Sequence, residues 1–452
     1  MSVALLQAKL RSLLAADAIT GRFTRGVLWT LAGTVATNAS GLVVAVITAQ
    51  LLGKEGYGAV GVLVSTYTLF GQFSTLGLGL AATKFVAENR VSNPSLASRI
   101  AGTSLVISLL SYSGASLALW SLAPTLARHA LAAPGLAAPL RLTSILLLLS
   151  GISGVQTSIL AGLEAFRGMA RILAWRGLLN VILTPLGGRL FGLNGIIWAM
   201  IITAAAQCVA MHVHLHATLR EHRMSLLFRI DRGDLSALIQ LAVPAFLAGI
   251  LVVPSTWLVN VFLVNQPQGY AEMGVLNAAT QWRALAVLVP NVFNSVVLAF
   301  QSHLYGAGAR KQFDQLALAN LKVQTLASAV VAGCICLTAP WIMALYGTGF
   351  GGHEAVLIWL AVGWVLLAPS WTLWNIYVST GQIWLGFTFN LIGTACLLML
   401  ALYLRGLGAL GIAIAYAVSG VVQITMQGGY FAYWRRSART ESGAIQVSAA
   451  DA

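Results

Sequence analysis

Nine stretches of this sequence contain no aspartate, glutamate, lysine or arginine and are long enough to cross a membrane as helices. About 20 helical residues span the roughly 30 Å of hydrocarbon in a bilayer. Charged residues make up only 8 % of the chain, against about 25 % in an average soluble domain, so a soluble globular protein is excluded. Disorder is excluded as well, because apolar types make up 58 %. The stretches are Gly26–Gly53, Gly56–Thr83, Ile100–Ala127, Leu142–Leu163, Phe191–Leu219, Leu235–Ala271, Val323–His353, Ala355–Leu404 and Gly406–Trp434.

Three further segments raise the predicted number of spans to twelve. Ala355–Leu404 has 50 residues, too many for one helix, and the polar Ser379–Gln382 divides it into two. Met273–Ala309 is interrupted only by Arg283, and a weaker span runs from about Ile172 to Leu190. We therefore expect an all-α polytopic membrane protein with about 12 transmembrane helices.

Lysine and arginine are unevenly distributed between the two sides of these spans. With the N-terminus placed in the cytoplasm, 20 of the 26 lysines and arginines lie on the cytoplasmic side, five on the other side, and Arg283 within a span. This is a strong positive-inside bias, so the net charge of +14 reflects topology and predicts no nucleic-acid partner. Both termini are expected in the cytoplasm. Residues 1–20 lack the apolar core of a signal peptide and are expected to lie on the membrane surface as a helix.

An internal repeat divides the chain into two halves of six spans. Gly56–Leu63 recurs as Gly269–Leu276, shifted by 213 residues, and Gly192–Gly195 recurs as Gly408–Gly411, shifted by 216. Six is even, so both halves enter from the same side and the repeat is parallel, which predicts two lobes around a central cavity. The predicted parts are a cytoplasmic segment 1–20, an N-lobe 21–217, a cytoplasmic linker 218–235, a C-lobe 236–434 and a cytoplasmic tail 435–452.

No motif in the sequence points to catalysis, a metal or a cofactor. A Walker A motif is lacking, so the chain is not expected to hydrolyse ATP. All four cysteines fall in spans, which argues against disulfides and metal binding. His212 and His216 share a helix face at the end of the sixth span while His214 does not, which is more typical of a solvated helix end than of a metal site. We predict that the protein is not an enzyme and holds neither cofactor nor metal.

Arg283 is the strongest candidate for ligand binding. If its helix starts near Glu272, eleven residues place it about 16 Å deep, where a charge is costly and is a functional hypothesis by default. Polar residues share its face over an arc of about 160°, which favours contact with water or a ligand. The alternative is that Arg283 binds carbonyl oxygens of neighbouring helices or extends to the outer surface. The predicted substrate-binding residues of this stripe are Arg283, Asn277, Gln281, Asn291 and Asn294.

The first span carries a second polar stripe, in which Thr34 and Asn38 are predicted to bind substrate. Arg25 and Lys84, at the cytoplasmic ends of the first two spans, are predicted to form the cytoplasmic entrance. No carboxylate lies at the middle of a predicted span, although a carrier of organic cations or a carboxylate-driven antiporter would be expected to bury one. The cavity is therefore predicted to suit a neutral or anionic ligand.

Two prolines, Pro244 and Pro254, fall within the seventh span. Proline removes a backbone hydrogen bond and clashes with the preceding turn. We predict that this span bends at one of them and that the bend serves as a hinge for the second half.

Three segments resemble known transporters: Leu51–Gly58, Gly77–Glu88 and Gly269–Pro290. They are similar to the hairpins of bacterial polysaccharide transporters, the O-antigen and exopolysaccharide flippases of the multidrug/oligosaccharidyl-lipid/polysaccharide exporter (MOP) superfamily. The likeness covers about 22–435. It implies a two-lobed carrier that moves undecaprenyl-pyrophosphate-linked oligosaccharide across the bacterial cytoplasmic membrane by alternating access, with membrane lipids and the polysaccharide polymerase and chain-length machinery as candidate partners. Cationic residues in the cavity are typical of such carriers, and Arg283 occupies a matching place, although relatives often have several.

Other functions are open on the sequence alone. A multidrug antiporter of the same superfamily would be expected to bury a carboxylate, and a lipid II flippase usually has fourteen spans. A scaffold for a glycan polymerase would have no need of polar stripes. A membrane glycosyltransferase would need paired carboxylates or a metal cluster, and none is evident.

Overall fold

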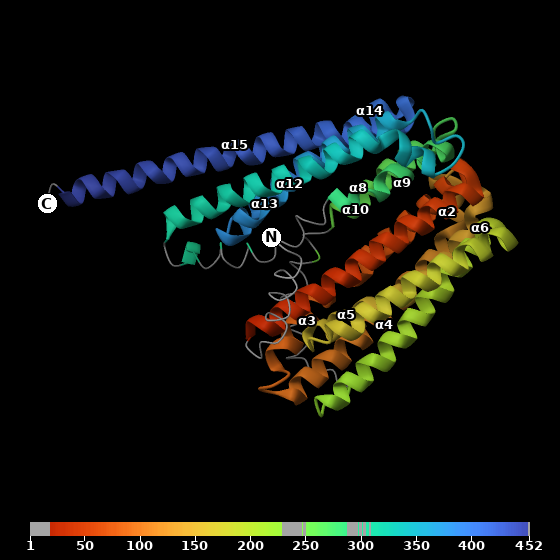
Figure 1. The fold of residues 1–452 in the computed structure, drawn as a ribbon, viewed down its shortest axis with the longest axis horizontal. Helices are drawn as coiled ribbons and strands as arrows, with labels where there is room; N and C mark the ends of the chain where they lie inside the picture. The colour runs from red at the N-terminus through yellow and green to blue at the C-terminus, as the bar shows by residue number, and fades with distance from the viewer. Residues whose placement is uncertain are drawn as a thin grey trace, which may run out of the picture. The chain divides into compact units, whose positions relative to one another are not determined.

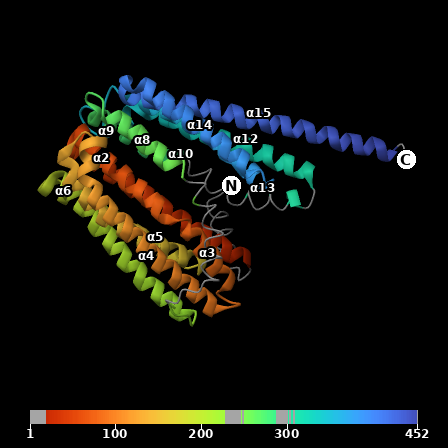
Figure 2. The same ribbon diagram turned by 180° about the vertical axis from the view of Figure 1, so that it is seen from behind.

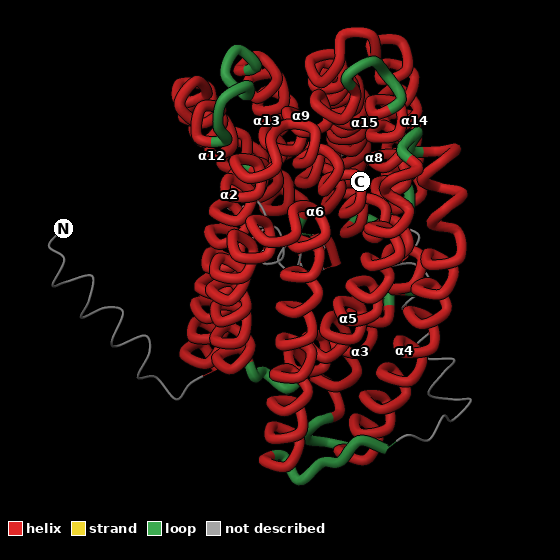
Figure 3. Tube along the Cα trace, turned by 90° about the vertical axis from the view of Figure 1, so that its right-hand side faces the viewer, coloured by secondary structure: helices red, strands yellow, loops and turns green. Residues whose placement is uncertain are grey.

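The computed structural model describes residues 19–227, 246, 250–286, 297, 301, 304–306 and 309–450. Throughout these ranges the regular structure is helical, without a strand (Figure 3). Seven helical segments are long and apolar enough to cross a membrane, and α8 (Val252–Val264) is a shorter apolar helix. The chain is therefore a multi-pass membrane protein, as its hydropathy predicts.

The chain forms two compact units. The first comprises Met1–Leu52 and Ala59–Trp257, and the second comprises Gly53–Gly58 and Leu258–Ala452. The predicted lobes were divided at a linker, 218–235, of which residues 228–235 lie outside the described residues. The short segment Gly53–Gly58 is a feature that the sequence did not indicate: it belongs to the second unit although the residues on both sides of it belong to the first.

The first unit is built from long helices that pack side by side (Figures 1 and 2). Two of them bend sharply at a glycine with positive φ: α2 (Ile19–Thr75) at Gly53, and α6 (Phe166–Glu221) at Gly192. Each therefore supplies two spans. The remaining helices are α3 (Leu78–Asn89), α4 (Pro94–Thr125), which continues into one π-helical turn, Leu126–Ala130, and α5 (Ala137–Gly162).

The second predicted span, Gly56–Thr83, is not continuous. Helix α2 ends at Thr75, and Leu76 and Gly77 follow with φ angles of 45° and 70° before α3 begins. The apolar pattern continues through this break because α3 buries Leu78, Ala81, Ala82 and Val86. Of these, Ala81, Ala82 and Val86 join a core with residues of α4, α5 and α6. The hydropathy pattern therefore reflects the burial of α3 but does not reveal the turn at Leu76 and Gly77.

The second unit contains α9 (Gly269–Gln281), α10 (Arg283–Ala286), α12 (Arg310–Leu345), α13 (Glu354–Ser379), α14 (Ile383–Leu404) and α15 (Gly408–Ala450). Aromatic and aliphatic side chains of α12 to α15 form its core, including Phe313, Tyr377, Phe389 and Phe431. With two spans each in α2 and α6, one each in α4, α5 and α12 to α15, and the seventh and eighth in α8 and α9–α10, the helices account for the twelve predicted spans.

The bend glycines confirm the internal repeat. Gly192 has φ 55° and ψ −133°, and its predicted counterpart Gly408 has φ 64° and ψ −143°. Side chains are disfavoured at such angles, so glycine is required at both places. Beyond the bend of α6, the two arms come close: a Cβ atom built on Gly195 would lie 1.8 Å from the carbonyl oxygen of Gly187. The hairpin therefore depends on the lack of a side chain at Gly195.

Gly195→Ala is expected to destabilise the protein, because overpacking costs roughly 1–3 kcal/mol when the obstacle cannot move. The matched control is Gly154→Ala in α5, where a Cβ atom meets nothing within 4 Å. Alanine is better than glycine in a helix interior by about 0.5–1 kcal/mol, so this control should keep or raise the melting temperature. Thermal unfolding of the purified protein measures both. Equal melting temperatures for the two variants would contradict the close contact.

Candidate functional site

Arg283 lies deep within the eighth span and is exposed. Helix α9 begins at Gly269, three residues earlier than expected, so fourteen residues precede Arg283 and place it about 21 Å along the helix axis. Trp282 is in a turn, and Arg283 opens the short helix α10. Gln281 is also exposed, and Asn277 is half-buried one turn earlier. The described part of the predicted stripe is therefore present on one segment, whereas Asn291 and Asn294 lie outside the described residues.

An aromatic cluster packs against this segment. The ring of Tyr57 packs against Tyr346, with centroids 6.1 Å apart, and against Phe350, at 6.4 Å. Asn277 Nδ2 donates a hydrogen bond of 3.4 Å to the carbonyl oxygen of Tyr57. The indole of Trp282 lies beside the Tyr346 hydroxyl. All of these residues belong to the second unit. The segment that carries Arg283 therefore packs against aromatic side chains of its own unit.

Glycines let the Gly53–Gly58 segment approach α9 backbone to backbone. A Cβ atom on Gly58 would lie 1.9 Å from the carbonyl oxygen of Tyr270, and one on Gly274 would lie 2.1 Å from that of Lys54. Gly58 and Gly274 both fall in the repeated motifs found in the sequence. Of the two, only Gly274 has a glycine counterpart in the repeat, Gly61, since Gly58 corresponds to Ala271; both have a packing role that the repeat alone did not reveal.

Glu272 ties α9 to α15. Its Oε2 accepts a hydrogen bond of 2.8 Å from the backbone N–H of Ala409, at the start of α15. A carboxylate is favourable there because the N-terminus of a helix carries partial positive charge. The carboxyl group is thus engaged at a helix end. Every other carboxylate whose side chain the structure describes also lies near a helix end or bend, so within the described residues no mid-span acid offsets Arg283.

The predicted residues of the first span lie in the first unit, on α2. Thr34 and Asn38 are half-buried. The Thr34 hydroxyl donates to the carbonyl oxygen of Thr30 at 2.8 Å, and Thr30 and Thr37 bond back in the same way. A threonine whose hydroxyl donates to the carbonyl oxygen four residues earlier can face lipid as well as water. This stripe is therefore weaker evidence for a water-exposed surface than its composition suggested.

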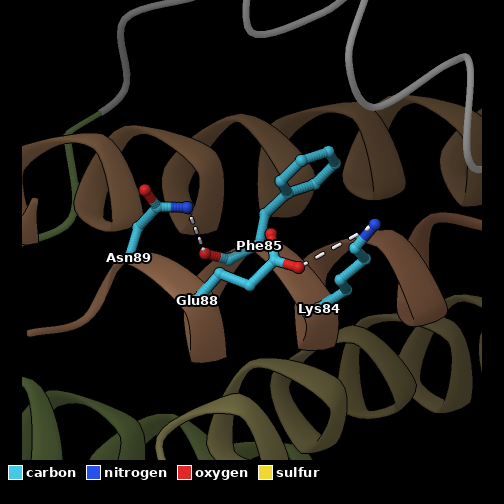
Figure 4. Close-up of polar contacts among 4 residues, drawn as sticks. All are labelled: Lys84, Phe85, Glu88 and Asn89. Carbon is cyan, nitrogen blue, oxygen red and sulfur yellow. Dashed lines mark hydrogen bonds and ion pairs between the residues drawn. The ribbon is translucent and has the colours of Figure 1, made fainter. Parts of the chain in front are cut away.

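Lys84 is the described member of the predicted entrance pair, since the side chain of Arg25 lies outside the described residues. Lys84 is half exposed on α3, with its Nζ atom 3.8 Å from Glu88 Oε1 and 5.7 Å from the centre of the Phe85 ring (Figure 4). Both contacts are local to one helix and exposed, so they leave the ammonium group accessible. The entrance role of Lys84 stays a prediction.

The predicted hinge is described only in part. Pro244 lies outside the described residues. Pro254 is the third residue of α8, within the first turn, where the missing N–H has no helical partner to lose. A helix can begin at this place without distortion, and whether the complete span bends there stays a prediction.

Arg176 is a cation within the weak fifth span that the sequence analysis did not single out. Helix α6 begins at Phe166 rather than near Ile172, so Arg176 lies ten residues, about 15 Å, along its first arm. It is half-buried and close enough to Tyr67 of α2 to act on it electrostatically. An earlier start for the weak fifth span would have revealed it.

A buried seam of neutral amides in the second unit was also missed. Gln324 Nε2 donates to Asn320 Oδ1 at 3.2 Å, and Asn320 Nδ2 donates to the Thr372 hydroxyl at 3.4 Å. The three side chains are almost fully buried between α12 and α13. The first bond lies within α12 and the second joins α12 to α13, and such interhelical side-chain hydrogen bonds help to hold a membrane bundle together. The charge-free stretch of this span begins at Val323, directly after Lys322, so Asn320 lay outside the predicted span.

Comparison with solved structures identifies the class of fold. An inward-facing multidrug resistance MATE family transporter of the MOP superfamily matches with a TM-score of 0.74 and 17% identity, over 91% of this chain and 99% of that one. An outward-facing structure of such a transporter matches at 0.70 and 17%, over 92% and 96%. A MOP superfamily transporter from Pyrococcus furiosus, whose binding pocket is described as having reverse polarity, matches at 0.67 and 18%, over 91% and 96%. The fold is that of the MOP superfamily transporters.

The family follows from the sequence. Residues 23–299 match the family described as polysaccharide biosynthesis protein, which is more than half of the chain. The chain belongs to that family, and the resemblance to polysaccharide exporters of the MOP superfamily is confirmed. A search of curated proteins finds no match.

The Tyr57 cluster yields a stability prediction. The Tyr57 ring is 4% exposed, and its hydroxyl lies near the Gln281 side chain but forms no hydrogen bond of regular geometry among the described residues. Tyr57→Phe should therefore keep or raise stability, because an unbonded buried hydroxyl is unfavourable by about 1–3 kcal/mol. Tyr57→Ala should lose roughly 3–5 kcal/mol through the cavity it leaves. Chemical unfolding followed by circular dichroism compares the two, and a Phe variant as unstable as the Ala variant would show that the hydroxyl makes an essential bond.

Proposed function

We propose that this protein is a flippase that moves undecaprenyl-pyrophosphate-linked oligosaccharide across the bacterial cytoplasmic membrane, by alternating access, for polysaccharide or O-antigen synthesis. Family membership and fold support a carrier in polysaccharide biosynthesis. The single observation that carries the substrate assignment is the exposed Arg283, about 21 Å along its span with no mid-span acid among the described side chains. An uncompensated cation at that depth suits an anionic ligand.

The role of Arg283 is to bind the pyrophosphate. A guanidinium group offers a fork of donors that matches phosphate oxygens and stays charged inside a membrane. Asn277 and Gln281, on the preceding turns, supply amides for hydroxyl groups of the sugars. Thr34 and Asn38 of α2 stay predicted substrate-binding residues. The multidrug antiporter is the weaker alternative, because cation recognition needs a buried carboxylate and the described acids lie near helix ends.

The transported charge gives the membrane potential a role as driving force. A pyrophosphate diester carries about two negative charges, and moving each across 100 mV is worth about 2.3 kcal/mol. With the cell interior negative, the potential favours outward movement by at most about 4–5 kcal/mol. This limit holds if the head group crosses the full field and Arg283 does not move with it.

Arg283→Ala is expected to abolish surface polysaccharide in a strain from which the native gene is deleted, while the protein stays in the membrane at normal abundance. Arg283→Lys should retain part of the activity, because it keeps the charge but loses the planar fork. The control is Arg189→Ala, an exposed arginine in the first arm of α6 close to its bend. Surface glycan and membrane abundance are measured by immunoblot. Normal export by the alanine variant would remove Arg283 from the mechanism.

A further inference from the structure

A groove opens between the two arms of α6 in the first unit. It has a volume of about 210 Å³ and is lined by Ile172, Trp175 and Leu179 of the first arm, by Ala206, Gln207 and Ala210 of the second, and by Arg171 and Arg176. Its walls are almost wholly apolar, so the two arginines contribute mainly their aliphatic stems. The groove therefore combines a hydrocarbon surface with two cationic groups at its border.

The two arginines sit on one helix at different depths. Arg171 and Arg176 are five and ten residues from the start of α6, so their Cα atoms are separated by about 7.5 Å along the axis. Arg171 is exposed and Arg176 is half-buried. Within the described part of the chain neither forms an ion pair with a carboxylate. Two cations beside an apolar wall at these depths favour a ligand that brings negative charge into the membrane.

The shape of the groove favours a single hydrocarbon chain. Two of its lining residues, Ala206 and Ala210, have small side chains, and its volume of about 210 Å³ leaves room for a short stretch of hydrocarbon chain. Trp175, which is 68% exposed, offers an aromatic face at the border of the groove.

We propose that this groove binds the head-group end of an isoprenoid pyrophosphate lipid, with the first isoprene units between the arms of α6 and the two phosphates at Arg171 and Arg176. A pyrophosphate places charge on two phosphorus centres, which matches two guanidinium groups, whereas an ordinary phospholipid has one phosphodiester and two chains. The proposal rests on the proposed function and adds to it a loading site on the first unit.

The test is lipid binding by the full-length protein, measured by native mass spectrometry with sugar-free undecaprenyl pyrophosphate as the probe. The double substitution Arg171→Gln with Arg176→Gln should weaken binding at least tenfold. Ala210→Phe, which fills the groove without changing charge, should weaken it to a similar extent. Arg189→Gln, on the same arm but away from the groove, is the matched control and should bind as the unaltered protein does. Melting temperatures of all variants establish that each is folded.

Competition identifies the source of the phosphate chemistry. Phosphatidylglycerol and inorganic pyrophosphate should each displace the probe at least tenfold less well than undecaprenyl pyrophosphate itself. Unchanged binding by both the double variant and the Ala210→Phe variant would overturn the proposal. Equal displacement by phosphatidylglycerol would also overturn it, because the groove would then be an ordinary phospholipid site. These outcomes are independent of Arg283, which is intact in every variant, so failure here is separable from failure of the proposed function.

Discussion

The cost of placing a charge in hydrocarbon governs how this chain is organised. Only 8 % of its residues are charged, and most of the cations lie on the predicted cytoplasmic side, where they set orientation. Arg283 lies about 21 Å along its helix, and Arg176 lies about 15 Å along its own. A guanidinium group so placed is favourable only with water or an anion beside it. The absence of a mid-span acid from the described side chains leaves an anionic ligand as the partner that best compensates these charges.

Close backbone contacts hold the Arg283 segment in position. Gly58 and Gly274 bring Gly53–Gly58 against α9, and the rings of Tyr57, Tyr346 and Phe350 fill the space beside them. In lipid, helix association depends on such close packing and on interhelical hydrogen bonds rather than on apolar burial. The bond from Ala409 to Glu272 adds a fixed point on α15. A binding group on a segment fixed in this way can be presented reproducibly, which a carrier requires of its substrate site.

Hydropathy predicted the all-helical fold and the twelve spans, because the thickness of the bilayer sets the length of a charge-free helix. The repeat was predicted from glycine motifs that recur in the two halves. Hydropathy did not predict the break at Leu76 and Gly77, since burial of α3 against protein has the same apolar pattern as burial in lipid. Within the candidate site, the start of the helix that leads to Arg283 was predicted to within three residues. Arg176 was not singled out because the fifth span was predicted to begin near Ile172, which puts Arg176 only four residues inside its cytoplasmic end. The clustering of Tyr57 with Tyr346 and Phe350 depends on tertiary contacts that no local pattern encodes.

The central claim is that an anionic head group crosses the membrane through this protein. Transport in reconstituted vesicles tests it most directly, with a lipid-linked oligosaccharide in the inner leaflet, the membrane potential clamped by potassium and valinomycin, and no proton or sodium gradient. The account predicts that flipping out of the compartment accelerates as its interior becomes negative and slows when the sign is reversed, because about two negative charges move with the substrate. Flipping that ignores the potential but follows an imposed proton or sodium gradient would contradict it and indicate antiport instead.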